Sequence, residues 1–188
     1  MKSRLTGLVV LLLTVTSLGL ITPVRTADAS PTAETSPSSA ARAPFKGTWR
    51  LLSFETRLSD GSVTYPFGTD AQGIVNYTPD GRMAVAVWKA NRTPFAVNDL
   101  QLGTPEEYTA AMKGYIQYMG TVTVDREHRT VHHKVDSSVF PNWVGSTQSR
   151  FYEFNDDGTR LVLSTPPIQF GGVTAVGALV WERVETTD

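Results

Sequence analysis

Apolar and polar residues alternate along most of the chain after residue 45, which is the pattern of β-strands, whose successive side chains point to opposite faces. Gly47 to Arg57 is the first such segment, and because it carries apolar residues on both faces, we expect both faces to be covered. The same pattern predicts strands at residues 73–78, 82–88, 118–125, 130–137, 148–155, 160–164 and 178–184, with a short extended piece near 63–67.

Asp-Gly turns separate several of these strands, at Ser59-Asp60-Gly61, Pro79-Asp80-Gly81 and Asp156-Asp157-Gly158. This dipeptide is typical of tight hairpins, so the strands on either side of each turn should be antiparallel neighbours. Eight or nine short strands with regular turns favour a closed barrel over an open sheet, since closure leaves no exposed edge. The predicted fold class is therefore all-β, an eight- or nine-stranded antiparallel barrel.

One helix interrupts the strands, between the fourth and the fifth. Its N-terminus is indicated by Thr104-Pro105-Glu106-Glu107, which supplies a capping Thr, a Pro at the first helical position and a Glu three residues after the cap. Apolar residues follow at helical spacing, at Tyr108, Ala111, Met112, Tyr115 and Met119. This stripe either packs on the barrel wall or belongs to a lid that contacts a ligand.

The first 44 residues differ from the rest. A basic start precedes an apolar run from Leu8 to Ile21, too short for a comfortable membrane span, and Ala27-Asp28-Ala29 is an A-x-A cleavage site. We therefore expect a secretory signal peptide over residues 1–29 and a secreted or extracytoplasmic protein with no stable membrane anchor after cleavage; an uncleaved anchor helix is the alternative. Residues 30–44 are predicted to be a disordered Ser/Pro/Ala-rich tether, 45–184 the barrel and 185–188 a flexible tail.

Composition excludes several classes of function. The chain has no Cys, which excludes disulfides, thiolate nucleophiles and thiolate metal sites. Its formal net charge of −1 and the lack of a Lys/Arg run argue against nucleic acid as a partner. His132 and His133 are adjacent in a strand and face opposite sides, so no metal site is expected. We expect no cofactor, since the sequence contains no Gly-rich phosphate loop.

The segment Gly47-Thr48-Trp49 resembles the first strand of the lipocalins and their calycin relatives, which opens with G-x-W. In those proteins the last strand supplies an Arg that stacks on this Trp at the closed end of the barrel. The resemblance assigns that place to Arg183, within Trp181-Glu182-Arg183, so that Trp49 and Arg183 close one end of the barrel.

A longer pattern is similar to the bacterial and fungal lipocalin-like domain family and covers nearly all of residues 45–184. It comprises G-T-W-R-L-L-S-F-E, G-I-V-N-Y-T-P-D-G-R-M, V-H-H-K-V, F-P-N-W-V-G, L-V-L-S-T-P-P and L-V-W-E-R. The resemblance implies an eight-stranded antiparallel barrel with an interior cavity, but no activity, because most members have no assigned role. The position of the helix and the lack of a disulfide depart from ordinary lipocalins and count against simple transport.

The candidate site is the segment from Thr130 to Tyr152, in which two strands flank an aromatic loop. Alternation places His133 on one face of the first strand and Arg150 on one face of the second. If these faces line the interior, both side chains lie inside the barrel, beneath a rim that contains Phe140 and Trp143.

The same alternation extends the site to the first strand. If Trp49 faces inward, so do Ser53 and Glu55, while Tyr152 shares the face of Arg150. A buried unpaired charge costs several kcal/mol, so Glu55 and Arg150 should be paired, wet or near the mouth. A partly polar interior favours a ligand with hydroxyl, carbonyl or carboxylate groups. The predicted ligand-binding residues are Ser53, Glu55, His133, Phe140, Trp143, Arg150 and Tyr152.

Three functions fit these patterns. The first is a secreted binding protein that holds a small amphipathic molecule, or a hydrophobic molecule with a polar head, in the barrel. The second is an isomerase or cyclase in which His133, assisted by Glu55 or Tyr152, moves a proton while Arg150 holds an anionic group. The third is a scaffold filled by its own side chains, with no cavity of roughly 300 Å³ or more. Structural roles stay open too, for His133 as a core histidine and for Glu55 with Arg150 as a salt bridge.

Overall fold

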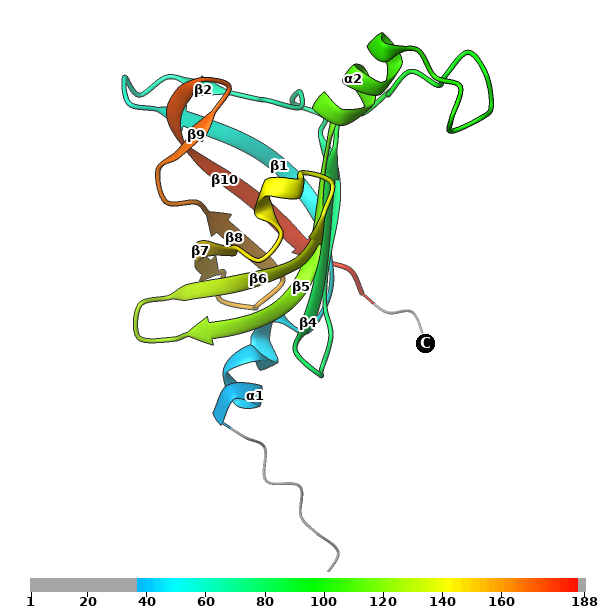
Figure 1. Ribbon diagram of the computed structural model, residues 1–188. Coiled ribbons are helices and arrows are strands. Elements are labelled where there is room, and N and C mark those ends of the chain that lie inside the picture. Colours follow the sequence, from blue (N-terminus) through cyan, green and yellow to red (C-terminus); the bar gives the residue numbers. More distant parts are fainter. Residues whose placement is uncertain (1–36, 186–188) are drawn as a thin grey trace, which may run out of the picture. The chain divides into compact units, whose positions relative to one another are not determined.

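A closed antiparallel barrel makes up most of the structure, a computed structural model that describes residues 37–185 (Figure 1). Each of its eight strands pairs with the next, and pairing of the first with the last closes the ring. Two short strands, β2 (Val63–Thr64) and β9 (Ile168–Phe170), pair with the first and last barrel strands. The barrel strands are β1 (Gly47–Leu58), β3 (Gln72–Tyr77), β4 (Arg82–Trp88), β5 (Tyr115–Asp125), β6 (Thr130–Ser138), β7 (Thr147–Phe154), β8 (Arg160–Ser164) and β10 (Val173–Arg183).

The predicted barrel and its turns are confirmed. Gly61, Gly81 and Gly158 have φ of 83°, 86° and 70°, a region that is strained for residues with a Cβ. In the first of these turns the Asp60 carboxylate accepts a hydrogen bond of 2.8 Å from the backbone N–H of Ser62. Asp-Gly therefore serves two purposes, since Gly supplies the backbone conformation and Asp pairs an otherwise free amide.

A β-bulge in β1 exchanges the inner and outer faces of that strand. Leu51 pairs with Trp181, but the next pair is Ser53 with Val180, so one extra residue lies between them. Trp49 and Leu51 are buried before the bulge, whereas Phe54 and Thr56 are buried after it. An extra residue shifts every following side chain to the opposite face.

The prediction that Ser53 and Glu55 face the interior is therefore wrong. It assumed unbroken alternation from Trp49. Glu55 instead forms a 2.8 Å ion pair with Arg57, whose side chain is 65% exposed, on the outside of the barrel.

The predicted tether is wrong where the structure describes it. Residues 37–42 form a short helix, α1 (Pro37–Arg42), and a 3-10 turn, η1 (Ala43–Phe45), follows. Arg126 donates a 2.6 Å hydrogen bond to the carbonyl of Ala40, which holds α1 against the β5–β6 turn. The predicted signal peptide and the first residues of the tether lie outside the described residues.

The helix between β4 and β5 is confirmed as α2 (Pro105–Lys113), at the opposite end of the barrel from α1 (Figure 1). Its capping box is complete, because Thr104 accepts from the backbone of Glu107 and Glu107 accepts from the backbone of Thr104. The helix is shorter than its apolar stripe, since Tyr115 and Met119 belong to β5. No residue of α2 is buried, so it does not pack on the wall as a core helix does. None of the helices within residues 37–185 is long and apolar enough to cross a membrane.

Trp49 and Arg183 close the end of the barrel near α1, as the resemblance implied. The guanidinium of Arg183 lies 4.1 Å from the centre of the Trp49 ring. It also donates to the carbonyls of Lys46 at 2.6 Å, Pro44 at 2.8 Å and Gly158 at 3.2 Å. One side chain thus joins η1, the start of β1 and the β7–β8 turn.

We predict that Arg183→Lys lowers the free energy of unfolding by about 2 to 3 kcal/mol, because an ammonium cannot reproduce three carbonyl bonds and a planar stack. Urea unfolding measures the change. The control is Arg50→Lys, which alters the exposed ion pair of Arg50 with Glu182 and should cost less than about 1 kcal/mol. Equal effects of the two substitutions would contradict the structural role of Arg183.

Candidate functional site

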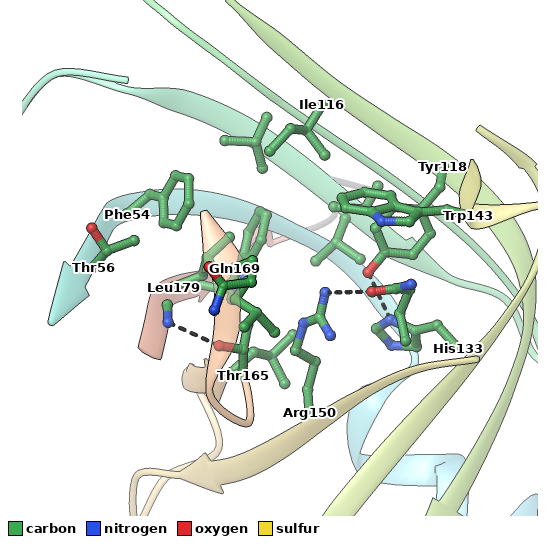
Figure 2. A pocket seen from close by; sticks show the side chains of 18 residues that line it. Phe54, Thr56, Ile116, Tyr118, His133, Trp143, Arg150, Thr165, Gln169 and Leu179 are labelled. Carbon is green, nitrogen blue, oxygen red and sulfur yellow. Dashed lines mark hydrogen bonds between the residues drawn. The ribbon is translucent and has the colours of Figure 1, made fainter. Parts of the chain in front are cut away.

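A cavity of about 160 Å³ lies inside the barrel (Figure 2). All eight barrel strands contribute to its lining, which is largely apolar and includes Phe54, Val75, Val85, Val87, Leu163 and Leu179. This volume is below the roughly 300 Å³ at which ligand pockets usually begin. It is nevertheless close to that of apolar protein cavities that hold one aromatic ring.

A second hollow of about 280 Å³ adjoins the first at the open end. The two share Ile116, Trp143 and Gln169 in their linings, and Met112 of α2 and Phe140 line only the outer one. Trp143 therefore lies between the mouth and the interior, which is the position expected of a gate. Phe140 and Trp143 thus lie at the mouth of the cavity, where the sequence predicted an aromatic rim.

His133 lies at the inner cavity with 1% of its surface exposed. Its Nε2 is 3.0 Å from the hydroxyl of Tyr77, and its Nδ1 is 2.9 Å from the hydroxyl of Tyr118. Strand alternation places it correctly, since Val131 and Val135 on the same face are also buried. Tyrosines from β3 and β5 thus hold both ring nitrogens.

Burial keeps this group of side chains uncharged. The pKa of His133 is lowered from 6.5 to about 3, mainly by burial and further by the charges of Arg150 and His132. Burial also raises the pKa of Tyr77 and of Tyr118, and the Arg150 charge opposes both increases. At neutral pH the group therefore consists of a neutral imidazole and two neutral phenols.

A count of hydrogens in this group leaves one unused. A neutral imidazole has one N–H donor and one acceptor nitrogen, so one tyrosine donates to His133 and the other accepts from it. The accepting tyrosine keeps its own O–H hydrogen, for which residues 37–185 show no acceptor. It is Tyr118, which lines the cavity, when the His133 proton is on Nδ1, and Tyr77 when the proton is on Nε2.

Arg150 reaches the cavity from β7, as predicted, and the salt bridge with Glu55 that the sequence left open is not formed, because Glu55 pairs with Arg57. Its guanidinium donates to the carbonyl of Ser149 at 2.7 Å and to the side-chain oxygen of Gln148 at 3.5 Å. Figure 2 shows Arg150, Tyr118 and His133 pointing toward one another. We call these three residues the polar cluster.

Comparison with known families identifies the barrel. A profile of the lipocalin-like domain matches residues 46–184. The chain belongs to the lipocalin-like domain family. It is 36% identical over 89 residues to a protein of Aspergillus oryzae named 4'-hydroxy-3'-methoxypropiophenone carrier protein ppsC. That match covers 44% of this chain and 78% of the relative. No solved structure matches the chain.

The remaining predicted site residues of this lipocalin-like barrel lie elsewhere. Tyr152 is not part of the cavity lining; its ring packs 4.9 Å from that of Phe45 at the closed end. Ser53 and Glu55 do not line the cavity either. The positions of Tyr152, Ser53 and Glu55 therefore do not support the roles in ligand binding that the sequence predicted for them.

Several cavity residues were not predicted. Tyr118 could have been found, because it begins a predicted strand and shares a face with the apolar Val122. Trp181 could also have been found, because it shares a face with Arg183, which the family resemblance assigns to the closed end of the barrel. Thr56 was missed because the bulge inverts its strand. Within residues 37–185 no three His, Asp or Glu side chains gather as metal ligands do.

We predict that stability falls by about 2 kcal/mol between pH 8 and pH 5 through His133 alone. The sign follows from the lowered pKa: below 6.5 the unfolded chain takes up a proton that the folded chain refuses until about pH 3. Urea unfolding across this range measures it. His133→Gln should remove this part of the pH dependence, whereas His128→Gln, at an exposed position, should keep it. An unchanged slope in His133→Gln would show that His133 takes up its proton alike in the folded and the unfolded chain, and would contradict the lowered pKa.

Proposed function

We propose that this protein is a carrier that holds a small aromatic molecule with oxygen substituents inside its lipocalin-like barrel. The observation that carries the proposal is a cavity with apolar walls and a polar cluster on one side. Apolar walls bury a ring, while polar groups fix its orientation. The cavity volume of about 160 Å³ suits a single ring, and the outer hollow leaves room for a substituent.

The relative from Aspergillus oryzae supports this choice of ligand. Its name describes a carrier of a propiophenone, a single-ring ketone with a hydroxyl and a methoxy group. These groups match the polar side of the cavity, which has the hydroxyl of Tyr118 and the guanidinium of Arg150 for oxygen acceptors. We infer that the present chain binds a molecule of this chemical class.

The isomerase or cyclase mechanism finds less support. It requires His133 to exchange a proton near neutral pH, but a pKa of about 3 makes its ring a weak base. Its proposed assistants, Glu55 and Tyr152, do not line the cavity. Both nitrogens are also engaged by tyrosines, which suits a fixed element of a binding wall.

Export is part of the proposal. It is supported by the basic start, the apolar run and the A-x-A site of residues 1–29. Mass spectrometry of the protein released by cells that express the full chain should find Ser30 as the first residue. Retention inside the cell with Met1 intact would contradict export and leave the carrier function untouched.

We predict that the purified protein binds 4'-hydroxy-3'-methoxypropiophenone and that Leu179→Trp weakens this binding at least about tenfold. The larger ring would occupy space in the cavity, which Leu179 lines. Isothermal titration measures the affinity. Val180→Trp is the matched control, because its neighbouring position on β10 is outside the cavity lining. No binding of this or any other single-ring aryl ketone, or equal effects of the two variants, would contradict a ligand site in the cavity.

A further inference from the structure

The charge of the cavity wall is unbalanced. Arg150 is its one group with a permanent charge, and the lining contains no Asp or Glu. Within residues 37–185, no carboxylate pairs with Arg150, while Arg50, Arg57 and Arg82 each have an acidic partner at the surface. The guanidinium has five N–H donors, and its two internal acceptors are the Ser149 carbonyl and the Gln148 amide oxygen. A positive charge therefore faces the cavity with donors to spare.

Neutral donors add to this excess. The Tyr77–His133–Tyr118 group keeps one O–H hydrogen without an internal acceptor. The indole N–H of Trp181 is also buried without a partner in the described residues, and Trp181 lines the same cavity. A buried donor that lacks an acceptor is destabilising. The wall is thus short of oxygen acceptors and of negative charge at once.

A neutral carbonyl would supply an acceptor but would leave the charge of Arg150 unbalanced. An ionised oxygen supplies both, and hydrogen bonds between charged partners are roughly twice as strong as those between neutral groups. We propose that the ligand binds as an anion, with an ionised oxygen against the guanidinium of Arg150 and the hydroxyl of Tyr118, which is free to donate to the ligand when His133 carries its proton on Nδ1. The proposal rests on the carrier function and specifies the ionisation state of what is carried.

The protein groups that face Arg150 do not themselves titrate near neutral pH. His133 of β6 has a pKa of about 3, and burial raises the pKa of Tyr118 of β5 and Tyr77 of β3 above that of a free tyrosine. His132 of β6 does not line the cavity and bonds the hydroxyl of Ser149 at 2.8 Å, so a change in affinity between about pH 5 and pH 9 that parallels the phenolate absorbance of the bound ligand reports the ionisation of the ligand.

The test uses 4-nitrophenol, whose phenolate absorbs visible light, and 4-nitroanisole, a neutral ring of similar size. At a pH below that at which free 4-nitrophenol ionises, binding to the wild-type protein should increase the phenolate absorbance. The pKa of the bound phenol should fall by about one unit or more, and at higher pH it should bind at least about tenfold more tightly than 4-nitroanisole.

The variants assign the effect to Arg150. Arg150→Gln should abolish the shift in the phenol pKa, whereas Arg57→Gln, which removes a cation on the outside of the barrel, should keep it. If Arg150→Gln fails to fold, Arg150→Lys decides, because it keeps the charge and should retain part of the shift. A shift that survives in Arg150→Gln, or is lost entirely in a folded Arg150→Lys, would overturn the proposal.

Two further outcomes separate this proposal from the carrier function. Equal binding of both compounds, with the bound phenol still protonated, would refute an anionic ligand and leave the carrier function standing. Binding of neither compound, nor of the propiophenone, would overturn both.

Discussion

Hydrogen bonding between β1 and β10 is the interaction on which the rest of the structure depends. It turns a row of strands into a ring, so that the inner faces of all eight surround one space. A sheet left open at this seam would expose its edges and could not keep His133 out of water. The contacts of Arg183 fasten one end of the same seam, since this residue of β10 stacks on Trp49 of β1. Closure of the barrel and burial of Tyr118 and His133 are thus parts of one arrangement.

The sequence predicts positions well where strands are regular. His133 and Arg150 lie on β6 and β7, whose pairing runs without interruption between them, so period-two alternation places both side chains correctly. In β1 the same reasoning fails after Leu51, because the bulge is fixed by pairing with β10, more than one hundred residues away along the chain. Nothing within the segment itself signals the extra residue. Ser53 and Glu55 therefore exchange places with Phe54 and Thr56.

Contacts between distant strands explain the other differences. The two tyrosines that hold His133 come from β3 and β5, and no local pattern reveals that their hydroxyls meet one imidazole. The helix ends at Lys113 although its apolar spacing continues, because Tyr115 pairs with Trp88 of β4 and so joins the sheet. Residues 37–44 read as a linker by composition, yet they begin with α1, which Arg126 holds through the carbonyl of Ala40. In each case tertiary packing overrides a local preference.

The bulge of β1 has a consequence for how such a barrel can diversify. If Leu52 were kept but paired with Val180, without the bulge, plain alternation would bring Ser53 and Glu55 into the interior in place of Phe54 and Thr56, whereas deletion of Leu52 would leave all four residues on their present faces. Without the bulge, an acidic group would face Arg150 from across the barrel. One change of register can therefore alter the chemistry of the cavity as much as several point substitutions, so the presence of this bulge bears on ligand preference across homologues.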